Sequence, residues 1–166
     1  MIGIISDSTC DIPEALLDLH RIVVVPQLVI WGDRQYRDRI DMHAAEFYRR
    51  MTIDPDVPHS SLPAMKDFRD AYEAEIARGC DQLVVLTVSS AMSGTFEMAK
   101  AAAEGLPATA AIVDSKGPTM SLGWQVLAAA RAREAGADLD EILRQVERVR
   151  QRLVLLVGMT SLKYLR

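Results

Sequence analysis

The sequence contains little cysteine, with only Cys10 and Cys80 among its 166 residues. These two lie far apart and match no metal-binding spacing, so they suggest neither a zinc site nor a disulfide framework. The first residues also lack the charged region and long apolar run of a secretory signal peptide. Two thiols without such a signal are typical of a reducing compartment, so we expect a cytoplasmic protein.

Long apolar runs and an excess of one charge sign are also lacking. No uninterrupted apolar segment approaches the roughly 20 residues that a membrane-spanning helix needs, so we expect no membrane insertion. The 19 basic and 23 acidic residues give a net charge of −4, which does not favour nucleic acid as a partner. Apolar residues make up 49% of the chain and charged residues 25%, as in a globular domain.

The signature motifs of several enzyme classes are missing. The chain has no G-x-S-x-G elbow, no G-x-G-x-x-G fingerprint and no phosphate-binding P-loop. Of the three histidines, His20, His43 and His59, only the last lies beside serines, and neighbours in a chain seldom form a nucleophile and base pair. Serine hydrolysis and nucleotide binding therefore have no motif support.

Short apolar runs alternate with segments of helical periodicity along the chain. The runs predict strands near residues 2–5, 22–25, 83–88, 110–113 and 153–157, and the periodic segments predict helices near residues 11–19, 44–51, 65–76, 95–105, from 116 and from 138. Asp138 and Glu141 form a capping box for the last helix. Residues 28–36 predict a hairpin-like excursion around Gly32-Asp33. The order predicts an α/β fold with a parallel sheet in a three-layer α/β/α arrangement, as one domain over residues 1–166.

Polar turns follow several of the predicted strands. These turns are Asp7-Ser8-Thr9, Ser89 to Thr95, and Asp114-Ser115, and a fourth polar segment, His59-Ser60-Ser61, precedes a helix. Ligands of open α/β sheets bind at the carboxyl ends of the strands. We therefore expect a binding site built from these turns.

The turn Ser93-Gly94-Thr95 offers the sharpest chemistry. Gly94 permits close approach of the backbone, and the first amides of the following helix favour an anion such as a carboxylate. The alternative is that Ser93 only caps the helix. Ser60 and Ser61 could add hydroxyls to the same anion, although on local grounds capping of a helix led by Pro63 explains them better.

The two aspartates at strand ends allow a different function. Asp7 and Asp114 could hold Mg²⁺ or activate a water, as in a metal-assisted hydrolase or phosphotransferase. Carboxylates in such positions more often accept hydrogen bonds from loop amides, so we assign no catalytic residue, no metal and no cofactor.

The sequence resembles the DegV family along its whole length. The segments that carry the resemblance are Ile5 to Ile12, Val24 to Ile30, Tyr36-Arg37-Asp38, Glu46-Phe47-Tyr48, Ser60-Ser61-Leu62-Pro63 with Phe68, Ser89 to Phe96, and Val113-Asp114-Ser115. The resemblance implies a protein that binds a long-chain fatty acid and is not an enzyme. It further implies that the fatty acid is presented to a fatty acid kinase, which makes an acyl phosphate for phospholipid synthesis.

The resemblance also implies particular site residues. The carboxylate would be held by Ser60 or Ser61 together with Ser93, Gly94 and Thr95, and the acyl chain would lie in an apolar tunnel between two lobes. One departure is that the usual threonine and glutamine of a Thr-Ser-Gln-Pro segment stand here as Ser60 and Leu62, so an amide is lost.

The second departure concerns the length of the chain. The sequence ends at residues 161–166, where a new helix is predicted to begin, and the resemblance leads us to expect that residues 1–166 correspond to the amino-terminal lobe without the carboxy-terminal lobe. We therefore expect this chain alone to bind fatty acid weakly or to expose an apolar face that favours self-association.

Overall fold

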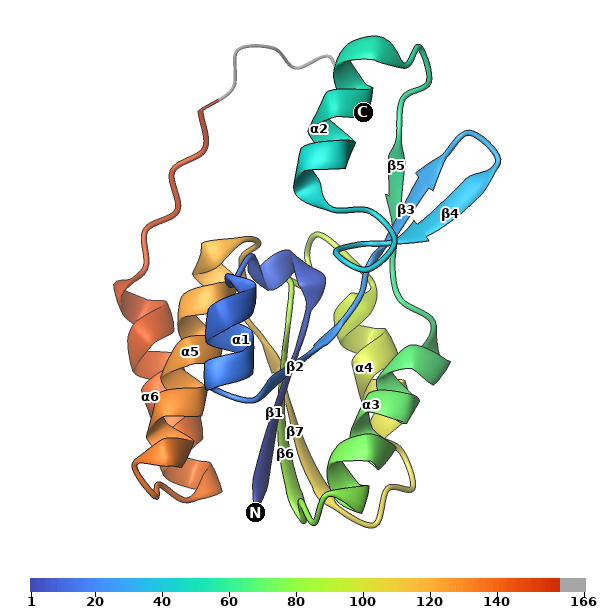
Figure 1. Cartoon of the computed structure of the whole chain (residues 1–166). Helices are drawn as coiled ribbons and strands as arrows, with labels where there is room; N and C mark the ends of the chain where they lie inside the picture. The colour runs from blue at the N-terminus through green and yellow to red at the C-terminus, as the bar shows by residue number, and fades with distance from the viewer. Residues whose placement is uncertain (159–166) are drawn as a thin grey trace.

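The computed structural model describes residues 1–158. A parallel sheet lies at the centre of this part of the chain (Figure 1). Its strands are β1 (Ile2–Asp7), β2 (Ile22–Val25), β6 (Gln82–Thr87) and β7 (Thr109–Asp114), in the order β2-β1-β6-β7. Every neighbouring pair is parallel. Such strands are covered on both faces, which explains why they appear in the sequence as short and nearly continuous apolar runs.

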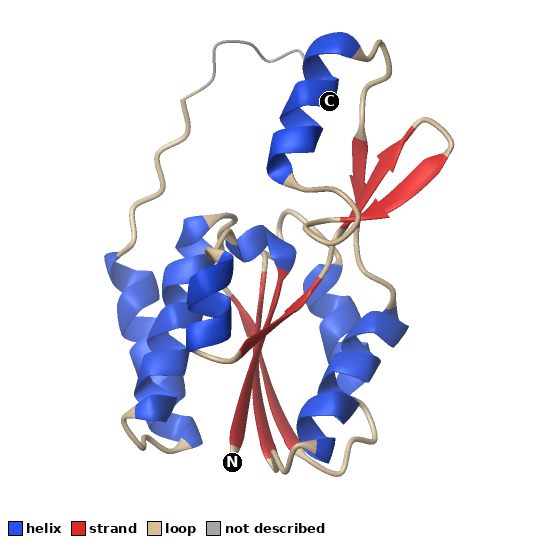
Figure 2. Ribbon diagram, viewed as in Figure 1, coloured by secondary structure: helices blue, strands red, loops and turns tan. Residues whose placement is uncertain are grey.

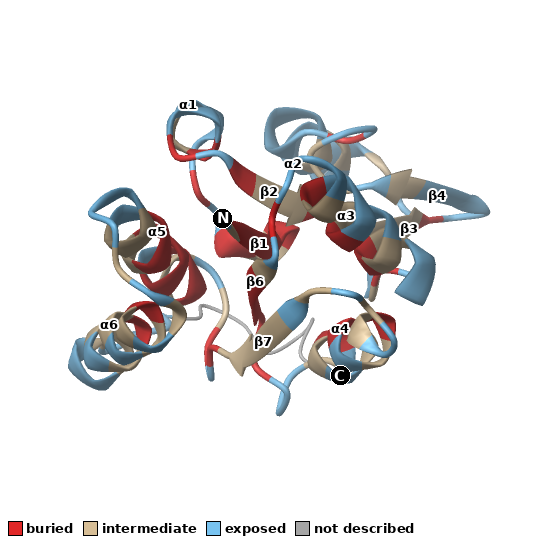
Figure 3. Cartoon of the chain, turned by 90° about the horizontal axis from the view of Figure 1, so that it is seen from below, coloured by how far each residue is buried: buried red, intermediate tan, exposed pale blue. Residues whose placement is uncertain are grey.

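Helices cover both faces of this sheet (Figure 2). One face carries α1 (Glu14–Leu19), α5 (Met120–Glu134) and α6 (Leu139–Arg152), and the other carries α3 (Met65–Ala77) and α4 (Thr95–Ala103). Each interface holds its own apolar cluster, and Figure 3 shows that the buried residues follow the sheet and the helix faces turned toward it. The predicted three-layer α/β/α fold is confirmed.

A small antiparallel sheet lies beyond the carboxyl edge of the main sheet, in the upper part of Figure 1. It consists of β3 (Leu28–Trp31), β4 (Arg34–Arg37) and β5 (His59–Ser61), in the order β4-β3-β5, and is accompanied by α2 (Ala44–Ile53). The predicted hairpin is confirmed as the pair β3 and β4. The small sheet and α2 together are called the upper layer below.

The segment His59-Ser60-Ser61 differs from its predicted local role. It forms β5, in which Ser60 pairs with Val29 and Ser61 with Leu28. The helix that follows begins at Met65 and has Ala64 at its N-cap position, so neither serine caps it. Pairing with β3, which is distant in the chain, decides this conformation.

The predicted strand at residues 153–157 is wrong. This segment follows α6 without joining either sheet, and Val154 and Leu156 are 81% and 88% exposed. An apolar run becomes a strand only where another strand completes its hydrogen bonds. The helix start predicted within residues 161–166 lies outside the described residues.

The capping signal places the start of α6 correctly, whereas α1 begins at Glu14 and α5 at Met120, a few residues after their predicted starts. The side chain of Asp138 accepts a hydrogen bond from the backbone amide of Glu141 at 2.8 Å, as the capping box predicts. None of the helices within residues 1–158 combines the length and apolar character that crossing a membrane requires.

Candidate functional site

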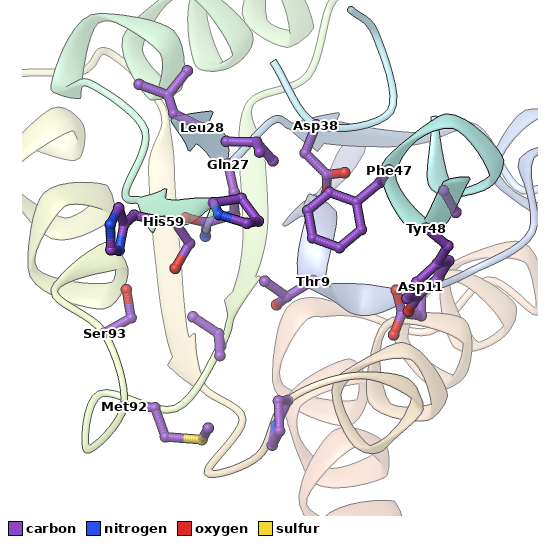
Figure 4. A pocket seen from close by; sticks show the side chains of 16 residues that line it. Thr9, Asp11, Gln27, Leu28, Asp38, Phe47, Tyr48, His59, Met92 and Ser93 are labelled. Carbon is purple, nitrogen blue, oxygen red and sulfur yellow. The ribbon is translucent and has the colours of Figure 1, made fainter. Parts of the chain in front are cut away.

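A cavity of about 560 Å³ lies where the carboxyl edge of the main sheet meets the upper layer (Figure 4). Its apolar lining consists of Leu28, Val29, Ala44, Phe47, Tyr48, Pro58, Val88, Met92 and Pro118. Its polar lining consists of Thr9, Asp11, Gln27, Asp38, His59, Ser60 and Ser93. The cavity therefore combines these apolar residues, called the apolar wall below, with a few hydroxyl, amide and carboxylate groups, which is the usual composition of a small-molecule site.

The turn Ser93-Gly94-Thr95 begins α4 beside this cavity. Ser93 lines the cavity, whereas Gly94 is the N-cap residue of the helix and Thr95 is fully buried behind it. The oxygen atoms Ser93 Oγ and Thr95 Oγ1 lie 2.8 Å apart, and Thr95 N donates to Ser93 Oγ at 3.3 Å. Ser93 thus supports the start of the helix and also presents its hydroxyl group to the cavity.

Ser60 reaches the same cavity from β5. It is exposed and lines the cavity with His59, whereas Ser61 does not belong to the lining. Figure 4 shows Ser93 and His59 on the same side of the cavity. Of the predicted site residues, Ser60 and Ser93 line the cavity, whereas Gly94 is exposed, Ser61 is half-buried and Thr95 is buried, all three outside the lining.

The two strand-end aspartates bind loops. Asp7 is fully buried and accepts hydrogen bonds from Thr9 N at 3.0 Å, Thr9 Oγ1 at 2.5 Å and Val88 N at 2.8 Å. Asp114 accepts from Ser90 N, Ser90 Oγ and Lys116 N. Neither carboxylate lines the cavity. The preferred interpretation of these aspartates as acceptors for loop amides is confirmed.

The environment of Asp114 changes its acidity. Desolvation acts to raise the pKa of this carboxyl, but the hydrogen bonds from Ser90 and Lys116 outweigh it, and the pKa lies below its usual value. In residues 1–158 no group of three or more His, Cys, Asp or Glu side chains is arranged to hold a metal ion. The hydrogen bonds to loop groups account for the positions of Asp7 and Asp114, and no contact of these two carboxylates supports the hydrolase alternative.

The carboxylates of Asp11 and Asp38 also line the cavity, and Figure 4 shows Asp11 on the side away from Ser93. Desolvation is the largest cause that raises the pKa of Asp11, and the nearby charge of Asp38 raises it further, while Arg39 opposes both. A third carboxylate brought to this side would meet like charge. An anionic group would therefore be placed at the side that carries Ser60 and Ser93.

Sequence reasoning missed Gln27, which links the elements of the site. Gln27 follows β2, is 9% exposed and donates from Nε2 to Thr95 Oγ1 at 3.1 Å. Its backbone amide donates to Ser8 Oγ at 3.0 Å, and Ser8 Oγ donates to Asp38 at 2.6 Å. The signal that could have found it is its position, because it lies at the carboxyl end of a predicted parallel strand.

The fold is a three-layer α/β/α domain, and it has a partly apolar cavity at the carboxyl edge of its parallel sheet. The family model described as "Uncharacterised protein, DegV family" matches residues 1–166, and the chain belongs to the DegV family. A DegV domain-containing protein from Clostridium acetobutylicum is 30% identical over 165 residues, which cover 99% of this chain and 58% of that protein. One from Staphylococcus aureus is 30% identical and is matched over 57% of its length.

Solved structures of this family share the fold and bind fatty acids. A fatty-acid-binding DegV family protein from Thermus thermophilus superimposes with a TM-score of 0.82 at 30% identity, over 90% of this chain and 53% of that one. The fatty-acid-binding DegV of Bacillus subtilis gives a TM-score of 0.85 at 26% identity, over 90% and 54%. A stearic-acid-binding protein from Eubacterium ventriosum gives 0.81 at 28% identity, over 89% and 52%. The chain spans about half the length of these proteins.

Proposed function

We propose that this chain binds a long-chain fatty acid, with the carboxylate beside Ser93 and the first methylenes along the apolar wall of the cavity. The observation that carries the proposal is that hydroxyl groups from β5 and from the start of α4 meet an apolar wall in one cavity. The fatty acids bound by family members of the same fold support it.

The headgroup chemistry follows from the polar side of the cavity. A carboxylate removed from water needs hydrogen-bond donors. The hydroxyls of Ser93 and Ser60 are neutral donors, and the amino-terminal end of α4 adds the favourable end of a helix dipole. Gly94 would contribute through its backbone at the start of α4, and Thr95 through its hydrogen bond with Ser93. Ser61 would contribute indirectly, by pairing with β3 next to Ser60.

The acyl chain would be held by the hydrophobic effect. Burying a methylene group is worth about 0.8 kcal/mol when water is excluded from both sides. The cavity is open, and the apolar residues Tyr48 and Met92 on its lining are 67% and 66% exposed. We therefore propose that this open cavity alone holds fatty acid weakly, and that its exposed apolar residues favour self-association.

The protein would act as a carrier and not as a catalyst. In this proposal a fatty acid kinase phosphorylates the carboxylate while the protein holds the acyl chain. The exposure of the cavity on one side is compatible with access to the carboxylate by a second protein. The bound fatty acid would be the ligand, and the reaction would need no cofactor from this chain.

Isothermal titration calorimetry with oleate tests the proposal. Ser93→Ala should weaken binding about tenfold, because it removes a hydrogen bond to a charged group. The matched control is Thr109→Ala, which removes an exposed hydroxyl at the amino end of β7 and should leave affinity unchanged. Mass spectrometry of lipid extracted from the purified protein should identify a long-chain fatty acid.

The two halves of the proposal are tested separately. Absence of oleate binding to the unaltered chain at millimolar concentration would contradict fatty acid binding. Unchanged formation of acyl phosphate, when a fatty acid kinase with ATP and oleate is supplied with or without this protein, would contradict the carrier role. Light scattering on size-exclusion fractions tests self-association, and a monomer at all concentrations would contradict it.

A further inference from the structure

Three side chains form a chain of hydrogen bonds that runs from the interior to the cavity. Gln27 Nε2 lies 3.1 Å from Thr95 Oγ1, and Thr95 Oγ1 lies 2.8 Å from Ser93 Oγ. We propose that Gln27 is a positioning residue that fixes the direction of the Ser93 proton and so makes the cavity selective for headgroups that accept hydrogen bonds. This hydroxyl relay (Gln27, Thr95 and Ser93) rests on the proposed function and specifies how the headgroup is chosen.

Gln27 is held firmly at the start of the relay. Its backbone amide donates to Ser8 Oγ at 3.0 Å, and its carbonyl oxygen accepts from the backbone amide of Asp38 at 2.8 Å. Its side chain is 9% exposed and Thr95 is fully buried. Because the backbone of Gln27 is fixed by two hydrogen bonds and its side chain is buried, the Nε2 group stays directed at Thr95 Oγ1.

The direction of the relay follows from donor and acceptor bookkeeping. Nε2 can only donate, so Thr95 Oγ1 accepts from Gln27. Within residues 1–158 the other hydrogen-bond partner of Thr95 Oγ1 is Ser93 Oγ, and a donation from Ser93 would leave the proton of the fully buried Thr95 without an acceptor, so we assign that proton to Ser93 Oγ. The backbone amide of Thr95 also donates to Ser93 Oγ, at 3.3 Å. The oxygen of Ser93 thus accepts twice, which uses both of its lone pairs.

One group of Ser93 then remains for a ligand, namely its own proton. Because Ser93 lines the cavity, this proton is directed toward the headgroup. A carboxylate can accept it, whereas an ammonium group is a donor only and would face another donor. The relay therefore discriminates between an acid and an amine that carry the same acyl chain.

A double-mutant cycle with oleate tests whether Gln27 acts through Ser93. Gln27→Met keeps the volume of the side chain but removes the donor, and we expect oleate affinity to fall about fivefold. In a Ser93→Ala background the same change should alter affinity by less than about twofold, because the group through which it acts is gone. Additive losses would overturn the relay.

A second ligand separates positioning from packing. Oleylamine has the same acyl length but a donor-only headgroup, so Gln27→Met should leave its affinity unchanged or raise it. A parallel loss for oleate and oleylamine would show that Gln27 only shapes the cavity. Gln151→Met, an exposed glutamine on α6, is the matched control and should change neither affinity.

A measurement without ligand keeps the relay and the proposed function distinguishable. In NMR spectra of the unaltered chain, the side-chain amide protons of Gln27 should exchange with water more slowly than those of Gln151. Thr95→Val removes the acceptor and should abolish this protection. Equal exchange in the unaltered chain and in Thr95→Val would overturn the relay, whereas slow exchange without any oleate binding would overturn only the proposed function.

Discussion

Gly123→Ala should destabilise the protein, although the same exchange usually stabilises a helix. Gly123 lies in the interior of α5, where alanine is favoured over glycine by about 1 kcal/mol. A Cβ atom added at this position would lie 2.3 Å from the carbonyl oxygen of Cys10 and 2.9 Å from Met120 Sδ. The first contact is with backbone, which cannot rotate away, so α5 would have to move from the turn at residues 8–10.

The size of the effect follows from the depth of the overlap. An ordinary contact begins at 3.4 Å, so the helix and the turn must separate by about 1 Å in a buried interface. Overpacking of this kind costs about 1–3 kcal/mol, and more where backbone must shift. Because the contact at 2.3 Å is with backbone, we take the upper part of this range, about 2–3 kcal/mol. After the gain of about 1 kcal/mol in helix propensity, we expect a net loss of about 1–2 kcal/mol and a fall in Tm of about 2–8 °C.

Thermal unfolding followed by circular dichroism measures this change. Ala74→Gly, at an exposed interior position of α3, is the control that reports helix propensity in this chain, and it should lower stability by about 1 kcal/mol. A Tm of Gly123→Ala equal to or above that of the unaltered chain would refute the argument, because propensity would then outweigh the contact with Cys10. Since Thr9 lies in the displaced turn and lines the cavity, the variant should also bind oleate less tightly.

Three further predictions concern side chains that hold loops or helices by hydrogen bonds. Asp7→Asn should lower the free energy of unfolding in urea by about 1–3 kcal/mol, because one of its three donors then faces an amide nitrogen, and unchanged stability would contradict its structural role. Tyr72→Phe should cost about 1 kcal/mol through loss of the 3.0 Å hydrogen bond to the Ala99 carbonyl, and no change in Tm would argue against that bond. The depressed pKa of Asp114 stabilises the fold above about pH 4 and this contribution is lost as the pH falls through the folded-state pKa, so acid should destabilise the unaltered chain more than Asp114→Asn. Equal acid sensitivity of the two would count against the Ser90 and Lys116 contacts.

The site joins segments that lie far apart in the chain. Ser93 lies in the turn before α4 and Ser60 in β5, and the apolar wall includes residues of β3 and α2. Each segment is fixed by different contacts, such as the hydrogen bond between Gln27 and Thr95, which are 68 positions apart. We therefore expect the cavity to depend on the whole fold, so variants that loosen the upper layer should weaken binding without touching a ligand.

Local pattern was enough to predict most of the helices and strands. The strands β1 and β6 are short apolar runs with polar residues directly after them, and the helices carry their apolar residues at spacings of three and four. The same strand-end rule predicted that Ser93 would lie at a binding edge. These features depend on a few neighbouring residues, so they can be recognised without a structure.

Pairing between distant segments was not predictable in the same way. His59-Ser60-Ser61 is polar, and it is a strand because β3 offers hydrogen-bonding partners. Residues 153–157 are apolar, yet they belong to neither sheet of the described part of the chain. Strand formation depends on the partner at least as much as on the residues themselves, which explains both errors.

By itself, the sequence determined the alternating elements, the layered fold and a hydroxyl-rich turn at the start of a helix, because those depend on local periodicity and on capping chemistry. Only the tertiary structure decided that Ser60 and Ser93 share a cavity, that Gln27 reaches Thr95, and that Asp7 and Asp114 are turned toward loops. The physical reason is that a hydrogen bond between groups many residues apart depends on how the layers pack. No short stretch of sequence carries that information.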